Sequence, residues 1–68
     1  MKISARNALK GTITDVKKGQ TTAHVVLDVG GQTVTASITN ESVDALKLAK
    51  GQKAYAVIKA SDVMIGID

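Results

Sequence analysis

The sequence predicts a small, mainly β domain of five short strands, with one short helix between the third and the fourth strand. Three observations support this fold class. Several runs rich in β-branched residues alternate between apolar and polar side chains, which is typical of half-buried strands. Glycines separate these runs, and the chain contains no proline. A single segment breaks the alternation and has the end signals of a helix.

The first three strands are expected at residues 12–16, 23–27 and 33–38, which are rich in Val, Ile and Thr. Within the second run three consecutive apolar residues occur without alternation, which indicates a strand covered on both faces or one at a subunit interface. Gly30 and Gly31 separate the second run from the third. Two adjacent glycines supply the positive φ angles of a tight turn, so we expect a hairpin here.

The segment 39–48 predicts a helix of about two turns. Either Thr39 or Asn40 can cap its amino end. Glu41 and Asp44 fall in the first turn, where the helix dipole favours acidic side chains. Lysines and then a glycine follow at the carboxyl end, as is usual where a helix stops.

Residues 54–58 and 63–65 supply the fourth and fifth expected strands. Five strands with one helix between the third and the fourth is the element order of an OB-like barrel. The chain has no low-complexity segment and no shift in composition that would mark a linker. We therefore expect one domain, residues 1–68.

The chain is too small to bury a large core. A domain of this size buries only about 60% of the surface that its unfolded chain exposes, and Tyr55 is the only aromatic residue. Small domains of this kind usually gain stability from disulfides, a structural metal or a partner subunit. With no cysteine and only one histidine, His24, the sequence excludes disulfides and zinc sites built from Cys and His. We therefore expect self-association.

The charge balance favours anionic partners. Nine basic residues against six acidic ones give a formal net charge of +3, which suits nucleic acid, phosphate-like anions or acidic proteins. The amino terminus has no apolar stretch of signal-peptide length, and no apolar run is long enough to cross a membrane. We therefore expect a cytoplasmic protein with no membrane partner.

We do not expect an enzyme. A serine or threonine nucleophile needs a neighbouring base, and the single imidazole, His24, falls inside an expected strand, with no glycine-bounded elbow around any serine. We interpret His24 as a side chain on a half-buried strand face or at a subunit contact. The acidic residues are explained by the helix start and by strand ends and turns, not by a catalytic pair.

Hydrogen-bond donors are concentrated at three motifs: residues 4–7, 39–42 and 59–61. Each motif combines hydroxyl groups with a cation or with the amino end of the expected helix. A fully deprotonated tetrahedral dianion needs donors on all its oxygens and a compensating positive charge. Arg6 and Lys59 would supply two such charges. The motifs therefore favour a small oxyanion as ligand, although a hydroxyl at a helix start is, taken alone, usually a cap.

Together the three motifs resemble those of the molbindins, also called molybdenum-pterin-binding proteins, over nearly the whole chain. The same unit is similar to the repeated domain of molybdate-responsive transcription regulators and to accessory domains of molybdate-transporter ATPases. The resemblance implies an OB-like subunit of a homohexamer that holds molybdate, and tungstate as a further ligand, at subunit interfaces for storage and homeostasis. It also implies a site in which one subunit contributes Ser4, Arg6, Lys59, Ser61 and the backbone amide of Ala60, while a neighbour contributes Thr39 and Ser42.

The family also has a second kind of interface site, which we expect the turn at residues 18–20 to approach. The pterin of the older name has no support in the sequence, because no aromatic pair is present to sandwich a ring. We therefore expect the bare oxyanion as ligand. Two alternatives stay open: a single-stranded nucleic-acid-binding OB module, which would have Tyr55 as its only stacking platform, and a purely structural oligomerisation domain.

Overall fold

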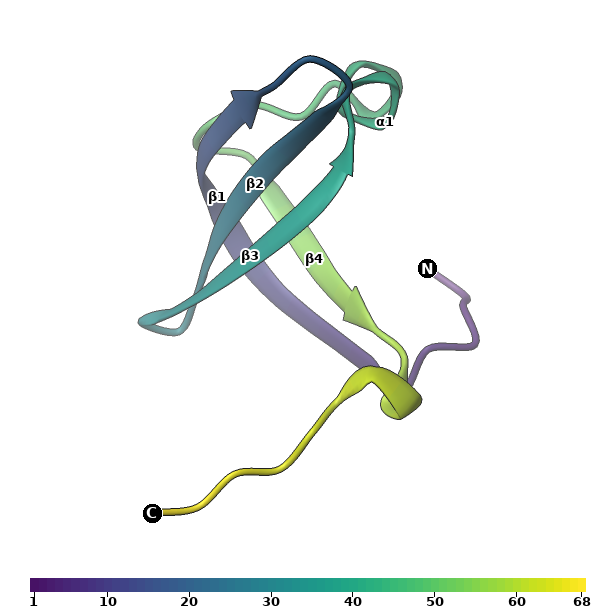
Figure 1. Ribbon diagram of the computed structural model, residues 1–68, viewed down its shortest axis with the longest axis vertical. Helices are drawn as coiled ribbons and strands as arrows, with labels where there is room; N and C mark the ends of the chain where they lie inside the picture. Colours follow the sequence, from purple (N-terminus) through teal and green to yellow (C-terminus); the bar gives the residue numbers. More distant parts are fainter.

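The computed structural model describes all residues from 1 to 68, and it confirms a mainly β fold with one short helix between the third and the fourth strand. The strands form one antiparallel sheet in the order β3-β2-β1-β4. Figure 1 shows this sheet curling about itself, so that β3 crosses in front of β4 in that view. The elements are β1 (Asn7–Lys18), β2 (Thr22–Val29), β3 (Gln32–Thr39), α1 (Asn40–Leu46), β4 (Lys53–Ile58) and the 3-10 helix η1 (Ala60–Asp62).

One predicted element is absent from the structure: the expected fifth strand at residues 63–65 is not formed, and the sheet is not closed into a barrel. Val63 has extended backbone angles, with φ −96° and ψ 127°. The segment nevertheless pairs with no strand of its own chain, and Figure 1 shows it running away from the sheet. An apolar run in the sequence predicts an extended segment, but it does not identify the strand edge that would pair with it.

β1 begins at Asn7, earlier than predicted, because its two halves pair with different strands. Its first half pairs with β4, from Asn7 opposite Ile58 to Thr12 opposite Lys53. Its second half pairs with β2, and the register shifts between residues 13 and 15. Gly11 lies at the crossover, where an added Cβ would come within 2.5 Å of the Asp28 carbonyl oxygen. This close approach explains why the position lacks a side chain.

The predicted hairpin and helix are confirmed. Gly30 and Gly31 have φ angles of 58° and 89° and form the two-residue turn between β2 and β3. Thr39 is the N-cap of α1, and its hydroxyl oxygen accepts the Ser42 amide at 3.0 Å. The helix ends at Leu46, and its C-cap Lys47 takes the left-handed conformation with φ 53° that glycine more often occupies.

The buried core is small and contains no aromatic ring. Ten large hydrophobic side chains are exposed, which exceeds the number of buried ones. The chain itself therefore leaves much of its apolar surface uncovered. The buried core consists of Ile13, Ala23, Val25, Leu27, Val43 and Ala56.

No helix in the structure has the length and the apolar character needed to cross a bilayer.

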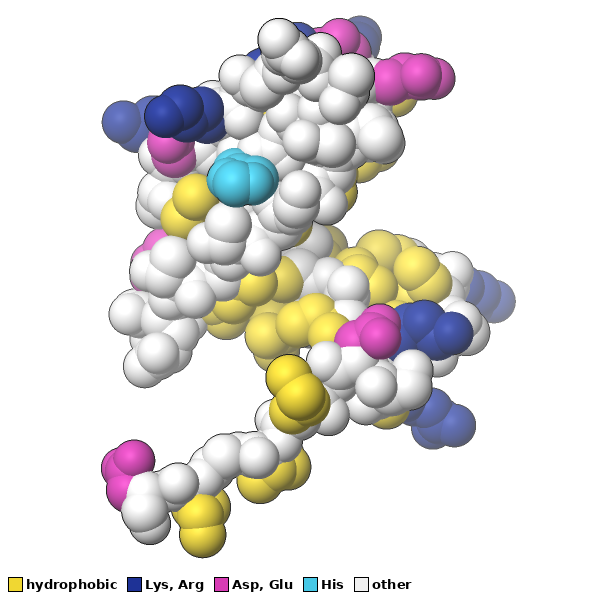
Figure 2. All heavy atoms as spheres, in the orientation of Figure 1, with side chains coloured by type: hydrophobic (Ala, Val, Ile, Leu, Met, Phe, Trp, Pro, Cys, Tyr) yellow, Lys and Arg dark blue, Asp and Glu magenta, His cyan; other side chains and the backbone are white.

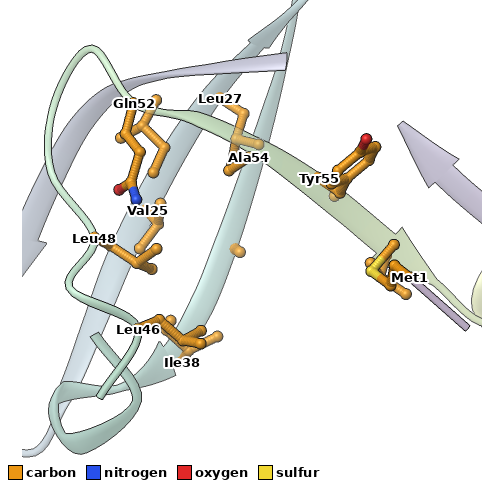
Figure 3. A pocket seen from close by; sticks show the side chains of 13 residues that line it. Met1, Val25, Leu27, Ile38, Leu46, Leu48, Gln52, Ala54 and Tyr55 are labelled. Carbon is orange, nitrogen blue, oxygen red and sulfur yellow. The ribbon is translucent and has the colours of Figure 1, made fainter. Parts of the chain in front are cut away.

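A groove of about 500 Å³, called here the apolar groove, opens between β3, β4 and the segment after α1. All of its 13 lining residues except Gln52 are hydrophobic. Figure 3 shows their side chains converging from the strands and from the loop, with Leu46 and Ile38 at one end and Met1 at the other. The groove thus lies between the two outer strands of the sheet, β3 and β4.

Candidate functional site

The motifs at residues 4–7 and 59–61 lie together at one end of the ladder between β1 and β4. Asn7 is paired with Ile58 on the last rung, and its side-chain Nδ2 donates to the Ile58 carbonyl oxygen at 3.2 Å. The chain before β1 and the chain after β4 therefore leave the sheet side by side, as Figure 1 shows at the start of β1 beside η1. We call this group, residues 4–6 and 59–61, the basic cluster.

The two cations of the basic cluster are free to bind an anion. Arg6 and Lys59 are both exposed, and neither lies within ion-pair distance of a carboxylate, because the only ion pair of the structure joins Lys18 and Asp44. Figure 2 shows dark blue Lys and Arg side chains at this lower end of the molecule. One carboxylate, that of Asp62, belongs to the same turn and would oppose an anion placed too close to it.

The 3-10 turn of the basic cluster also presents free backbone donors. The Asp62 and Val63 amides donate to the Lys59 and Ala60 carbonyls, at 2.9 and 3.2 Å. The amides of Ala60 and Ser61 come first in the turn, so they have no partner within it. The Ser61 hydroxyl is exposed beside them. The turn thus supplies donors next to two cations, which is what a small oxyanion requires.

The third motif forms a second group, the hydroxyl pair of Thr39 and Ser42, at the start of α1. The Thr39 hydroxyl accepts the Ser42 amide at 3.0 Å and donates to Ser42 Oγ at 2.8 Å. Its single hydrogen is therefore engaged within the pair. The Ser42 hydroxyl keeps its own hydrogen free for a ligand, and the bond from Thr39 strengthens it as a donor.

Asn40 fixes the hydroxyl pair against the turn between β1 and β2. The backbone amide of Asn40 donates to the Thr21 carbonyl oxygen at 2.9 Å, and its side-chain Nδ2 donates to the Gly19 carbonyl oxygen at 3.0 Å. The ion pair of Lys18 with Asp44 links the same turn to the same helix. The sequence suggested Asn40 only as an alternative cap. Its role as a clamp depends on a contact with a segment 21 residues away, which no local pattern reveals.

The basic cluster and the hydroxyl pair lie at opposite ends of the molecule. The 12 residues of β1 run from the basic cluster at Asn7 to the turn that contacts α1 at Lys18. A straight strand of this length would span roughly 35 Å at a rise of about 3.3 Å per residue, and Figure 1 shows that the curved β1 still separates α1 from η1 along the long axis of the molecule. Donors must lie about 3 Å from the oxygens that they bind. One chain therefore cannot place both groups on the same small anion.

His24, the turn at residues 18–20 and Tyr55 lie outside the two groups. His24 lies on the exposed face of β2, opposite Lys17 on β1 and Ser37 on β3. A polar hollow of about 350 Å³ adjoins it at the turn of residues 18–20. No group of three His, Cys, Asp or Glu residues is placed to hold a metal ion. Tyr55, the only aromatic ring, is half exposed on β4.

The chain is similar to known proteins over nearly its whole length. A family model described as the TOBE domain matches residues 3–65. Molybdenum-pterin-binding protein 3 of Clostridium pasteurianum is 52% identical over 66 residues, which cover 96% of this chain and 97% of that protein.

Two solved structures have the same fold. The apo structure of MopII from Clostridium pasteurianum is 46% identical and superposes with a TM-score of 0.91, over 97% of this chain and 100% of that chain. The cytoplasmic molybdate-binding protein ModG, solved with molybdate bound, is 42% identical with a TM-score of 0.94, over 100% of this chain and 49% of that chain.

Proposed function

Because the chain belongs to the TOBE-domain family and, within it, to the molbindins, we propose that it binds molybdate, and tungstate as a further ligand. It acts as a binding protein that stores or buffers the oxyanion in the cytoplasm, not as an enzyme. It works as a homo-oligomer, a hexamer by resemblance to its family. ModG, which was solved with molybdate bound and is described as cytoplasmic, supports both the ligand and the location.

The separation of the basic cluster from the hydroxyl pair is the observation that carries this proposal. Since one chain cannot bring the two groups to one anion, the anion binds between two subunits, each of which supplies one group. The basic cluster contributes charge through Arg6 and Lys59 and donors through its hydroxyls and turn amides. The neighbour contributes the Ser42 hydroxyl, held and polarised by Thr39. The full set of site residues is Ser4, Arg6, Lys59, Ala60 and Ser61 from one subunit with Thr39 and Ser42 from the other, where Ser42 is the donor and Thr39 orients it.

The chemistry of these groups suits a dianion that carries no proton. Hydroxyls, amides and cations all donate hydrogen bonds, and such bonds are strongest to a charged acceptor. A protonated phosphate would also need an acceptor, and the basic cluster itself contains no carboxylate; the nearest one in the chain is that of Asp62, directly after Ser61. Closing the site between subunits excludes water and strengthens each charge interaction. Because only the assembled oligomer binds the anion, occupancy stabilises the assembly.

A calorimetric titration with molybdate tests the proposal, and it is repeated in excess sulfate and in excess phosphate. We expect binding that survives both competitors. Arg6→Ala should abolish most of this binding, whereas Lys10→Ala, which removes the same charge from an exposed position on β1, should leave it intact. The absence of heat, or equal affinity in the Arg6→Ala variant, would refute the proposal.

A gel-shift assay with single-stranded nucleic acid at physiological salt tests the alternative function, that of a single-stranded nucleic-acid-binding module. We expect no shift, because Tyr55 alone offers an exposed aromatic ring for stacking.

A further inference from the structure

A polar hollow of about 410 Å³, called here the outer hollow, lies outside both groups of the proposed molybdate site. Thr12 of β1 pairs with Asp28 of β2 on one side and with Lys53 of β4 on the other, so the three side chains form one row across the sheet. Thr12 and Asp28 are each next in the chain to a core residue, so their side chains project from the face opposite the core. None of the lining residues is hydrophobic, and they are Lys10, Gly11, Thr12, Asp28, Gly30 and Lys53.

The outer hollow contains two cations that take part in no ion pair. Lys10 and Lys53 are both exposed, and the single ion pair of the structure lies elsewhere. The Lys53 ammonium donates to Thr12 Oγ1 at 2.9 Å. This bond uses a lone pair of the Thr12 hydroxyl and leaves the hydroxyl hydrogen free to donate. The outer hollow therefore presents three kinds of donor to an anion: two ammonium groups and one hydroxyl.

Asp28 adds an acceptor to these donors. Its Oδ1 accepts the Gly31 amide at 3.1 Å, which holds the carboxylate against the turn between β2 and β3. Oδ2 remains to accept a hydrogen bond from a ligand. A carboxylate repels an anion that carries no proton, but it forms a strong, charge-assisted bond with a ligand hydroxyl. Three donors beside one carboxylate therefore select an oxyanion that still carries a proton.

We propose that the outer hollow is a binding site for inorganic phosphate in its hydrogen phosphate form. Lys10, Lys53 and Thr12 each donate to one of the three unprotonated oxygens, and Asp28 Oδ2 accepts the hydrogen of the phosphate hydroxyl. The share of one water in the liquid is about 30 Å³, so the outer hollow also has room for part of the hydration shell of the anion. This site does not rest on the proposed function, because it shares no residue with the basic cluster or with the hydroxyl pair.

The proton distinguishes phosphate from the anions that resemble it. Inorganic phosphate keeps at least one proton at neutral pH, whereas sulfate and molybdate keep none there. A phosphate monoester, with a second pKa of about 6, is mostly an unprotonated dianion under the same conditions. Sulfate, molybdate and a phosphate monoester would therefore each place an unprotonated oxygen against the Asp28 carboxylate.

An NMR titration of the isotope-labelled protein with inorganic phosphate at neutral pH tests the proposal. We expect the backbone amide signals of Thr12, Asp28 and Gly30 to shift and then to saturate as phosphate is added. Sulfate and methyl phosphate, a simple phosphate monoester, are titrated in the same way and should cause no saturating shift of these signals. Because the shifts are assigned to residues, phosphate bound at any other lysine of the chain is recognised as such.

Lys53→Met removes one cation but keeps the length of the side chain. It should weaken phosphate binding about tenfold, since a hydrogen bond to a charged group contributes about 1.5 kcal/mol or more. Lys50→Met is the matched control, because Lys50 is an exposed lysine of the loop between α1 and β4, outside the outer hollow. It should leave phosphate binding unchanged.

Asp28→Asn tests the acceptor. The asparagine keeps an oxygen for the Gly31 amide but replaces the negative charge with an amide donor, so the variant should bind sulfate at the outer hollow, which the wild type rejects.

Shifts that grow in proportion to phosphate concentration without saturation would overturn the proposal. Equal binding of sulfate or methyl phosphate by the wild type would overturn it as well, and so would unchanged affinity in Lys53→Met. Titration with molybdate is a separate readout, and both Lys53→Met and Asp28→Asn should bind molybdate as the wild type does. A protein that binds phosphate at the outer hollow but no molybdate would refute only the proposed function.

Discussion

The hydroxyl pair allows ligand binding and helix capping to be separated by mutation. Ser42→Ala removes the hydroxyl that we propose as a donor to the anion but keeps the backbone amide of residue 42 bonded to Thr39 Oγ1. A hydrogen bond to a charged group contributes about 1.5–3 kcal/mol, and 1.4 kcal/mol corresponds to a tenfold change in affinity. We therefore expect molybdate to bind roughly 10- to 100-fold more weakly, while the free energy of unfolding of the unliganded protein changes by less than about 0.5 kcal/mol.

Thr39→Val should have the complementary effect. It keeps the shape of the side chain but removes the acceptor for the Ser42 amide, and loss of such a cap costs about 1 kcal/mol. In a chain of this size that cost lowers the melting temperature by roughly 4–8 °C. Anion binding should weaken too, because the Ser42 hydroxyl loses the bond that orients it. Thr39→Ser retains the hydroxyl and should restore both properties.

Thermal unfolding followed by circular dichroism without ligand, and calorimetric titration with molybdate, measure the two effects. Ser37→Ala is the control for both variants, because Ser37 is an exposed serine of β3 that lies two residues before Thr39 and outside the hydroxyl pair. If Ser42→Ala bound molybdate as tightly as the wild type, the assignment of this hydroxyl to the site would be wrong. A failure of Thr39→Ser to restore capping would contradict the role given to Thr39.

Three further substitutions test the fold that holds the site. Gly11→Ala would put a Cβ at 2.5 Å from the Asp28 carbonyl oxygen and should lower the free energy of unfolding by about 1–3 kcal/mol. An unchanged melting temperature would show that β1 and β2 can move apart at this position without a loss of stability. Val43→Ala truncates the only buried side chain of α1 and should lower the free energy of unfolding by about 2 kcal/mol. Denaturant unfolding measures this loss, and a loss of stability smaller than that of an alanine substitution at an exposed position would contradict the packing of Val43 in the core. Asp44→Ala breaks the exposed ion pair with Lys18 and should change stability by less than about 1 kcal/mol, with no difference left at high salt; a large loss would mean that this pair is essential to the clamp on α1.

Local signals in the sequence predicted the turn and the helix well. The pair Gly30 and Gly31 has the positive φ angles that its turn requires, and Thr39 caps the helix as its side-chain chemistry suggests. The early start of β1 at Asn7 depends on pairing with β4, about 50 residues away in the chain. Such long-range pairing leaves no mark in the local alternation. The segment 63–65 is the opposite case, because its pattern predicts a strand while the chain itself supplies no paired neighbour.

The sequence predicts the residue types of the proposed site but not their arrangement. Donor-rich motifs and two cations indicated an oxyanion, and the structure places Arg6 and Lys59 at the same end of the sheet, as a shared site requires. The division into two distant groups follows only from the length of β1. Likewise, the bond from Thr39 to Ser42 could not be inferred from their spacing alone, because it depends on side-chain orientation at the helix start.

The central claim is that each anion is held by two different chains, and mixing two defective variants tests it most directly. Arg6→Ala damages the basic cluster and Ser42→Ala damages the hydroxyl pair, so each variant alone should bind molybdate weakly. Oligomers formed from equal amounts of both, purified through a different tag on each chain, should regain tight binding at about a quarter of their sites, where two intact groups meet. A mixture that binds no better than its components would contradict a site shared between subunits.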